Sequence, residues 1–102
     1  MAERKRAREV LAVPRFLRSK RRLPASIQEM VDDQVRKVLE DPLLGEPKTG
    51  ALRGVSVIKF KLGPHQYLLA YEFSPKLNQI TLLDVGVHEN FYRDLQKYRD
   101  SR

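Results

Sequence analysis

Residues 55–85 read VSVIKFKLGPHQYLLAYEFSPKLNQITLLDV, and this stretch decides the expected fold. It holds three segments rich in β-branched, aromatic and other apolar residues, at positions 55–62, 67–73 and 79–85. Two short turn sequences containing Gly, Pro, Ser and Asn separate these segments. Because connections this short join antiparallel neighbours, the sequence predicts a three-stranded antiparallel meander.

Helical spacing dominates the chain before these strands. Residues 16–22 read as a short basic helix with a narrow apolar edge. A longer helix follows, whose apolar face comprises Ile27, Met30, Val31, Val35, Val38 and Leu39. It starts either with Pro24 as its first helical residue or with a capping box made by Ser26 and Glu29, and it stops at Asp41, which precedes a proline. Residues 8–13 suit either a short strand or the start of a helix.

A last helix is expected over residues 88–98, with Phe91, Leu95 and Tyr98 facing inward. The helices must bury their apolar faces on the sheet, so we expect them on one sheet face, with the other face open to solvent. The predicted fold class is α+β: a helical hairpin packed on one face of a small curved antiparallel sheet, followed by a C-terminal helix. The chain of 102 residues is expected to form a single domain over 1–102.

The composition excludes several classes of protein. The absence of cysteine excludes a disulfide framework, a thiolate zinc site and a cysteine nucleophile. Two separated histidines without clustered carboxylates predict no metal site, and neither a glycine-rich phosphate loop nor a nucleophile-elbow serine is present, so no cofactor is expected. No apolar run approaches the length of a membrane span and no secretory leader is visible, so we expect a cytoplasmic protein that does not contact membranes.

The positive charge is concentrated at the N-terminus. Residues 1–22 carry nine Lys and Arg against two Glu, whereas the rest of the chain is balanced, so this segment holds the whole net charge of +7. The cluster suits either a polyanion partner, most simply nucleic acid, or a solvated arm that keeps the protein soluble. The sequence leaves open whether residues 1–22 are ordered. The candidate RNA-binding residues in it are Arg15, Arg18, Lys20, Arg21 and Arg22.

Two groups of residues could carry chemistry. Lys59 and Lys61 lie two apart on one face of a predicted strand, where they serve solubility or, with Arg53, bind phosphate. His88 and Tyr92 lie four apart at the predicted start of the last helix and would share one side of it. Attack of a ribose hydroxyl on its adjacent phosphodiester needs a proton acceptor, a proton donor and cationic stabilisation. The alternative is that His88 caps the helix and Tyr92 is a packing residue.

The order of four short motifs resembles that of the RelE/ParE superfamily of toxins from type II toxin–antitoxin systems. The resemblance covers roughly residues 24–98. The motifs are Leu52-Arg53-Gly54, Ile58-Lys59-Phe60-Lys61-Leu62, Tyr67-Leu68-Leu69-Ala70-Tyr71 and Asp84-Val85-Gly86-Val87-His88-Glu89-Asn90-Phe91-Tyr92.

The resemblance implies a toxin that enters the ribosomal A site and cleaves mRNA by attack of the message's own 2′-hydroxyl, without a metal. It assigns catalytic roles to Arg53, Lys59, Lys61, His88 and Tyr92. It also implies a cognate antitoxin, the ribosome and mRNA as partners, and operator DNA bound through the antitoxin.

One position departs from the family pattern: Leu68 stands where RelE-type toxins have a catalytic arginine. ParE-type relatives share the fold, lack nuclease residues and poison DNA gyrase. A gyrase-inhibiting toxin is therefore the alternative function, and an inactive relative that only binds its antitoxin and nucleic acid is the third.

Overall fold

The computed structural model describes residues 7–87 and 89–101, and its centre is one five-stranded sheet with the order β1-β5-β4-β3-β2. The strands are β1 (Glu9–Ala12), β2 (Glu46–Pro47), β3 (Val55–Leu62), β4 (His65–Ser74) and β5 (Gln79–Val87). The predicted antiparallel meander is confirmed as β3, β4 and β5. The short segment before the first helix is a strand, β1, and it pairs with β5 in parallel, so the sheet is mixed.

Three α-helices accompany the sheet: α1 (Pro14–Arg21), α2 (Ala25–Glu40) and α3 (Phe91–Asp100). The two predicted helices before the strands are thus confirmed, and the capping residue Asp41 ends α2. The predicted start of α2 is wrong in both versions. Pro24 is the N-cap rather than the first helical residue, and Ser26 already lies within the helix, where it cannot serve as the N-cap of a capping box.

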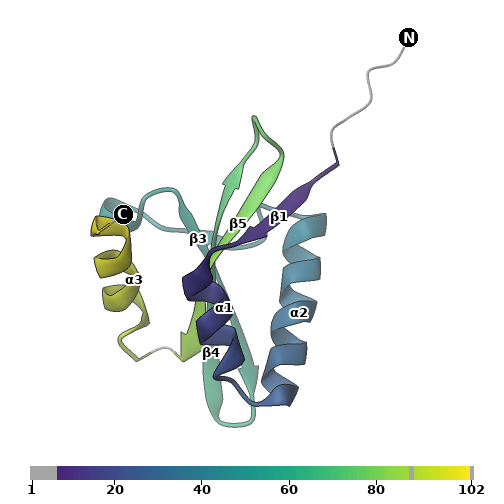
Figure 1. Ribbon diagram of the computed structural model, residues 1–102, viewed down its shortest axis with the longest axis vertical. Coiled ribbons are helices and arrows are strands. Elements are labelled where there is room, and N and C mark those ends of the chain that lie inside the picture. The colour runs from purple at the N-terminus through teal and green to yellow at the C-terminus, as the bar shows by residue number, and fades with distance from the viewer. Residues whose placement is uncertain (1–6, 88, 102) are drawn as a thin grey trace.

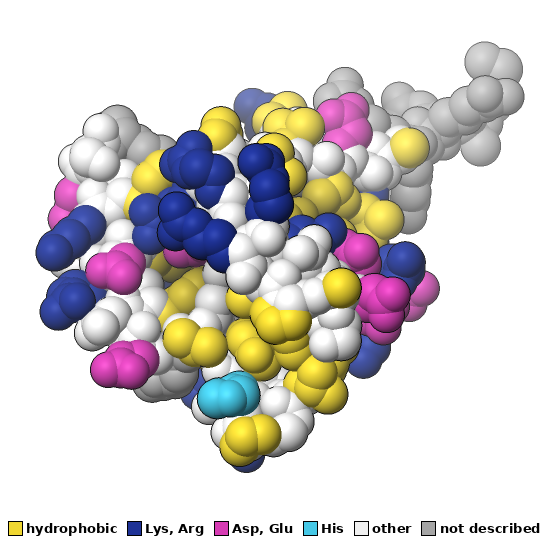
Figure 2. Space-filling view, turned by 60° about the horizontal axis from the view of Figure 1, so that its bottom comes forward, with side chains coloured by type: hydrophobic (Ala, Val, Ile, Leu, Met, Phe, Trp, Pro, Cys, Tyr) yellow, Lys and Arg dark blue, Asp and Glu magenta, His cyan; other side chains and the backbone are white. Residues whose placement is uncertain are grey.

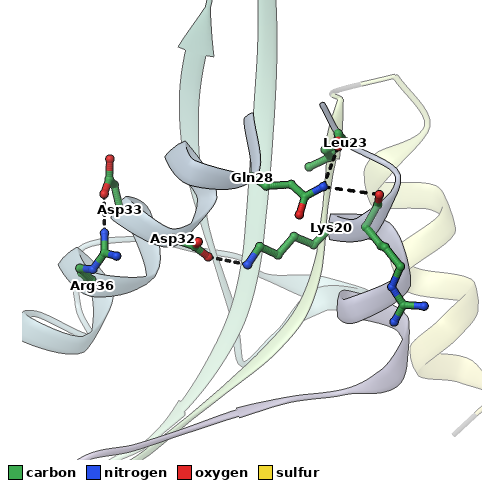
Figure 3. A network of polar contacts seen from close by, with 7 residues as sticks. Lys20, Leu23, Gln28, Asp32, Asp33 and Arg36 are labelled. Atoms are coloured by element: carbon green, nitrogen blue, oxygen red, sulfur yellow. Dashed lines mark hydrogen bonds and ion pairs between the residues drawn. The ribbon is translucent and has the colours of Figure 1, made fainter. Parts of the chain in front are cut away.

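Polar contacts join α1 to α2 across their short connection (Figure 3). The Lys20 ammonium donates to the Asp32 carboxylate at 2.5 Å, and the Gln28 side-chain amide donates to the backbone carbonyl of Leu23 at 2.8 Å. The second contact satisfies a carbonyl group between the helices. The two contacts tie α2 to α1 and to the connection between the two helices.

The α1–α2 hairpin covers one face of the sheet, as predicted. Apolar residues of both helices pack there against alternate residues of the three central strands. The buried cluster contains Phe16, Ile27, Val31, Val38, Ile58, Phe60, Tyr67, Leu69, Tyr71, Ile80, Leu82 and Val85. The apolar stripe of α2 that was read from the sequence is therefore the stripe that stabilises this layer.

The expectation of an open second sheet face is wrong. Phe91 and Leu95 of α3 pack on it, in a second buried cluster with Leu52, Val55, Val57, Leu68, Ala70 and Leu83. Figure 1 shows α2 and α3 on opposite sides of the sheet. The reason is visible in β4, where residues 67–71 are apolar on both faces, a pattern typical of strands that are covered twice.

The last helix begins at Phe91 rather than at residue 88. Asn90 precedes it in the left-handed conformation, with φ of 60°, which interrupts the helical path. The predicted start of this helix at residue 88 is therefore wrong, whereas the predicted proximity of His88 to Tyr92 stays a prediction. Tyr92 lies in the first turn of α3, and His88 lies outside the described residues.

Candidate RNA-binding and catalytic site

A lysine from the loop after β2 connects the sheet edge to α3. The short strand β2 pairs with β3 so that Glu46 lies opposite Val57, and the backbone N–H of Lys48 donates to the Val55 carbonyl at 2.8 Å. The Lys48 ammonium donates to Glu46 Oε1 at 2.9 Å and lies over the Tyr92 ring, 5.0 Å from its centre. The Lys48 side chain thus bridges β2 and the first turn of α3.

Glu46 and Lys48 each stabilise the charged form of the other. The hydrogen bond from Lys48, followed by the positive charges of Lys48 and Lys59, lowers the pKa of the Glu46 carboxyl. In the other direction, the hydrogen bond to Glu46 raises the pKa of Lys48 against the opposing effect of its burial, and contact with Tyr92 adds to the increase. Glu46 and Lys48 are therefore both ionised at neutral pH. We call Glu46, Lys48, Lys59 and Tyr92 the Lys48 cluster.

The structure brings two predicted residues, Lys59 and Tyr92, to this cluster. Lys59 is exposed on β3 and helps to line a shallow pocket of about 400 Å³ with Gln34, Lys37, Leu44 and Glu46. Lys61 is also exposed, two residues further along the same face of β3. The tyrosine hydroxyl is buried, beside Lys48.

Arg53 lies at the other end of β3. It follows the short 3₁₀ helix η1 (Gly50–Leu52), and Arg99 of α3 donates to its backbone carbonyl at 3.0 Å. The six-residue step from Val55 to Lys61 alone corresponds to roughly 20 Å of strand. Arg53 and Lys61 therefore cannot contact the same phosphate, and the three-residue phosphate patch does not form as one unit.

Two of the five predicted RNA-binding residues are engaged within the protein. Arg15 Nε donates to the buried Asp84 carboxylate at 3.0 Å, and its guanidinium lies over the Tyr98 ring, 5.2 Å from the centre. Lys20 is held by Asp32, as described above. Both side chains tie α1 to its neighbours rather than standing out from the surface.

The other three, Arg18, Arg21 and Arg22, are exposed and surround a hollow of about 370 Å³ on α1. Figure 2 shows a patch of Lys and Arg side chains over this helix. Arg21 and Arg22 also sit at the helix C-terminus, where positive charge is favourable. We call Arg18, Arg21 and Arg22 the arginine triad; it presents a concentrated positive charge suited to phosphates.

Glu46 and Lys48 were missed by reasoning from the sequence. They lie in a stretch punctuated by Gly and Pro that reads as loop, and β2 contains only two residues. The only signal was a pair of opposite charges, Glu46 and Lys48, just before the segment that carries Lys59. Their meeting with Tyr92 depends on the way α3 returns across the sheet.

Metal and membrane sites are not found in the part of the chain that the structure describes. Residues 7–87 and 89–101 contain no group of three or more His, Asp or Glu side chains placed to hold a metal ion. Over the same residues, no helix has both the length and the apolar character needed to cross a bilayer.

A family described as the ParE-like toxin of type II bacterial toxin–antitoxin systems matches residues 10–96. The chain belongs to this family. It is therefore a toxin of a type II toxin–antitoxin system, and the match spans both helices of the hairpin, the whole meander and most of α3. No curated protein matches the chain.

Solved structures show that the toxin has a RelE-like fold. A mutant of the Escherichia coli toxin RelE in the free state has a TM-score of 0.72 at 22% identity, covering 92% of this chain and 98% of that one. The E. coli RelBE toxin–antitoxin complex contains a chain with a TM-score of 0.66 at 24% identity, with coverage of 81% and 99%. A RelBE complex from Mycobacterium tuberculosis contains a chain with a TM-score of 0.66 at 21% identity, and the match covers 80% of this chain and 99% of that one.

The departure from the RelE pattern at Leu68 is part of the toxin's core. Leu68 is fully buried in the cluster under α3, paired with Lys59 on one side and Gly86 on the other. An arginine at this position would place a charged side chain in the apolar cluster that also contains Phe91 and Leu95. The exposed Lys59 lies opposite Leu68 on the neighbouring strand and carries a positive charge beside this position.

Proposed function

We propose that this toxin is a ribosome-dependent endoribonuclease that cleaves mRNA in the A site. The observation that carries the proposal is the Lys48 cluster, in which two lysines flank a carboxylate beside a tyrosine on one edge of the sheet. Cationic side chains fixed around a small site are suited to the charge that develops on a phosphodiester under attack.

In the proposed reaction the 2′-hydroxyl of a nucleotide attacks its own 3′-phosphate. The 2′-oxygen loses a proton and bonds to phosphorus, the bond to the 5′-oxygen of the next nucleotide breaks, and that oxygen takes up a proton. The products are a 2′,3′-cyclic phosphate and a 5′-hydroxyl end. Lys48, Lys59 and Lys61 stabilise the extra negative charge on the phosphate oxygens.

Proton transfer is assigned to His88, with Tyr92 stacking on a base or assisting the transfer. The lowered pKa of Glu46 makes it a weak proton acceptor, so we assign it the role of holding Lys48 in place. Arg53, at the far end of β3, would contact the RNA backbone away from the scissile phosphate.

The arginine triad supplies the second contact with RNA in this proposal. Arg18, Arg21 and Arg22 contact phosphates of ribosomal RNA, whereas Arg15 and Lys20 support α1 from within. Phosphate contacts of this kind add affinity and orientation without reading sequence.

A cognate antitoxin is the proposed protein partner. RelE-like neighbours have been solved in toxin–antitoxin complexes from E. coli and M. tuberculosis, and this supports the same arrangement here. Operator DNA would then be bound through the antitoxin, and the toxin would act in the cytoplasm. The product of the gene beside this one should co-purify with the toxin; failure of the two to associate would contradict this part of the proposal.

The deciding experiment is primer extension on a defined mRNA, incubated with purified toxin with and without programmed ribosomes. Cuts that need ribosomes and fall in the A-site codon are expected. The toxin with both Lys48 and Lys59 replaced by Met is the matched control and should leave the message intact. Absence of cuts from the folded wild-type toxin would overturn the endoribonuclease assignment.

A second candidate function is inhibition of DNA gyrase without catalysis. It is favoured by one observation, the buried apolar Leu68 at the position where RelE-type toxins carry an arginine. A supercoiling assay distinguishes the two functions, because inhibition of gyrase together with intact mRNA would select this candidate.

A further inference from the structure

A buried tyrosine from the centre of the sheet reaches the segment that carries the Lys48 cluster. Tyr71 of β4 is fully buried beneath α2. Its hydroxyl donates to the Pro42 carbonyl at 2.7 Å and accepts a hydrogen bond from the Gly45 N–H at 2.8 Å. Burial raises the pKa of the phenol, so the group stays protonated and keeps its donor.

The backbone at Gly45 lies directly against the Tyr71 side chain. A Cβ atom at position 45 would be 2.7 Å from Tyr71 Oη and 2.8 Å from Cε1. Glycine is thus needed for the segment to approach closely enough to hydrogen-bond the hydroxyl. Glu46 follows immediately, and Lys48 is three residues beyond Gly45.

The strand β2 has little else to hold it. It pairs with β3 over two residues only, Glu46 and Pro47. The Lys48 N–H bond to Val55 anchors its far end, and the Tyr71 hydroxyl anchors its near end. Both anchors are therefore needed to fix where Glu46 and Lys48 project.

We propose that Tyr71 is a positioning residue, whose hydroxyl holds residues 42–45 so that Lys48 is presented to Glu46 and Tyr92. This inference rests on the proposed function for its catalytic consequence, although the placement of Lys48 can be measured without any activity. A displacement of the order of 1 Å at a reacting group can cost about 100-fold in rate. Loss of the hydroxyl should therefore affect turnover more than binding.

The first experiment uses NMR of the full chain to measure whether the Lys48 side chain lies at the Tyr92 ring. The Lys48 ammonium lies over the Tyr92 ring, 5.0 Å from its centre, so the ring current should shift the resonances of the adjacent Hε protons. Tyr92→Leu gives the reference value without the ring. In Tyr71→Phe the Lys48 resonances should move to that reference. Tyr67→Phe is the matched control: it removes a hydroxyl from the same strand, where Tyr67 stacks on Phe60, and should keep the wild-type shift.

A second variant covers the case in which Tyr71→Phe does not fold. Gly45→Ala keeps the phenol but forces the segment away from it, and the Lys48 resonances should again move to the reference value. A wild-type shift in a folded Tyr71→Phe or Gly45→Ala protein would overturn the proposal.

The second experiment measures cleavage on programmed ribosomes. Tyr71→Phe should lower kcat by roughly 10-fold or more, with KM changed less than about twofold. Unchanged kcat in a variant whose Lys48 shift is lost would overturn the catalytic part of the inference. If the wild-type toxin cleaves no RNA at all, the proposed function fails, and the NMR result still decides whether Tyr71 positions Lys48.

Discussion

Arg15 Nε lies 3.0 Å from Asp84 Oδ2, and this contact joins the first turn of α1 to the centre of β5. Asp84 is 5% exposed and also accepts a hydrogen bond from the Val85 N–H at 2.9 Å. The guanidinium continues onto the Tyr98 ring of α3. One arginine of the basic N-terminal segment therefore links α1, the sheet and α3. Arg15 thus has a structural role, unlike the arginines of α1 that are exposed at the surface.

Replacement of Arg15 by Ala should destabilise the toxin. The change leaves the nearly buried Asp84 carboxylate without its cation, and loss of one partner of such a pair costs about 2 kcal/mol or more. Urea unfolding measures the effect, and Arg18→Ala on the same helix is the control, expected within about 0.5 kcal/mol of wild type. Equal stability of the two variants would contradict the structural role of Arg15.

Replacement of the arginine triad by glutamine should weaken RNA binding, with only a small loss of stability from removing positive charge at the C-terminus of α1. Each phosphate contact contributes roughly 0.7 to 0.9 to the slope of log affinity against log salt, so the triple variant should have a slope shallower by about 2 to 3. Fluorescence anisotropy with an RNA oligonucleotide over a salt series measures it. A triple change of Arg36, Lys76 and Lys97 to Gln removes the same charge at exposed positions elsewhere, and an equal loss of RNA affinity there would mean that net charge alone is responsible.

Replacement of Lys48 by Met should abolish most of the cleavage activity. Loss of a preorganised group that stabilises transition-state charge costs about 100- to 1,000-fold in kcat. Single-turnover cleavage on programmed ribosomes is the measurement, with Lys76→Met in the exposed turn after β4 as control. Activity retained in the folded Lys48→Met toxin would remove Lys48 from the mechanism.

The titration of Glu46 should depend on Lys48. The depressed pKa means that its contact with Lys48 persists at neutral pH and is lost only as the pH falls through a value below the ordinary range for Glu. The pKa of Lys48 is raised, so at the alkaline end the contact is lost only above the ordinary range for Lys. Carbon-detected NMR of the Glu46 carboxyl should show its midpoint rising in Lys48→Met, and an unchanged midpoint would show that the two groups do not interact.

Replacement of His88 by Ala should leave folding intact and lower cleavage by roughly 100-fold or more, the usual scale for losing a general acid–base group. Circular dichroism checks the fold, and primer extension with ribosomes measures cleavage. His65→Ala, in the exposed start of β4, is the matched control and should cleave at the wild-type rate. Undiminished cleavage by His88→Ala would remove His88 from the mechanism.

The local spacing of apolar residues in the sequence was sufficient to locate the central strands and the longest helix. The period-two alternation around Ile58 and Phe60 and the helical stripe through Ile27, Val31 and Val38 both specify which side chains are buried. Since backbone geometry links these periods directly to strand and helix, β3, β4, β5 and α2 could be located with small errors at their ends. The motif order around Lys59 and Tyr92 then indicated the family.

Tertiary structure alone decided which charges meet. Lys48 and Tyr92 are 44 positions apart, and they come together because α3 folds back over the sheet face beside β2. Likewise, Arg15 and Arg18 are two arginines of the same helix, and nothing in the sequence distinguishes their roles. Arg15 contacts Asp84, whereas Arg18 is exposed to solvent. A charge carries no periodic signal for its partner, because pairing depends on distances through space that are set only when the apolar surfaces have packed.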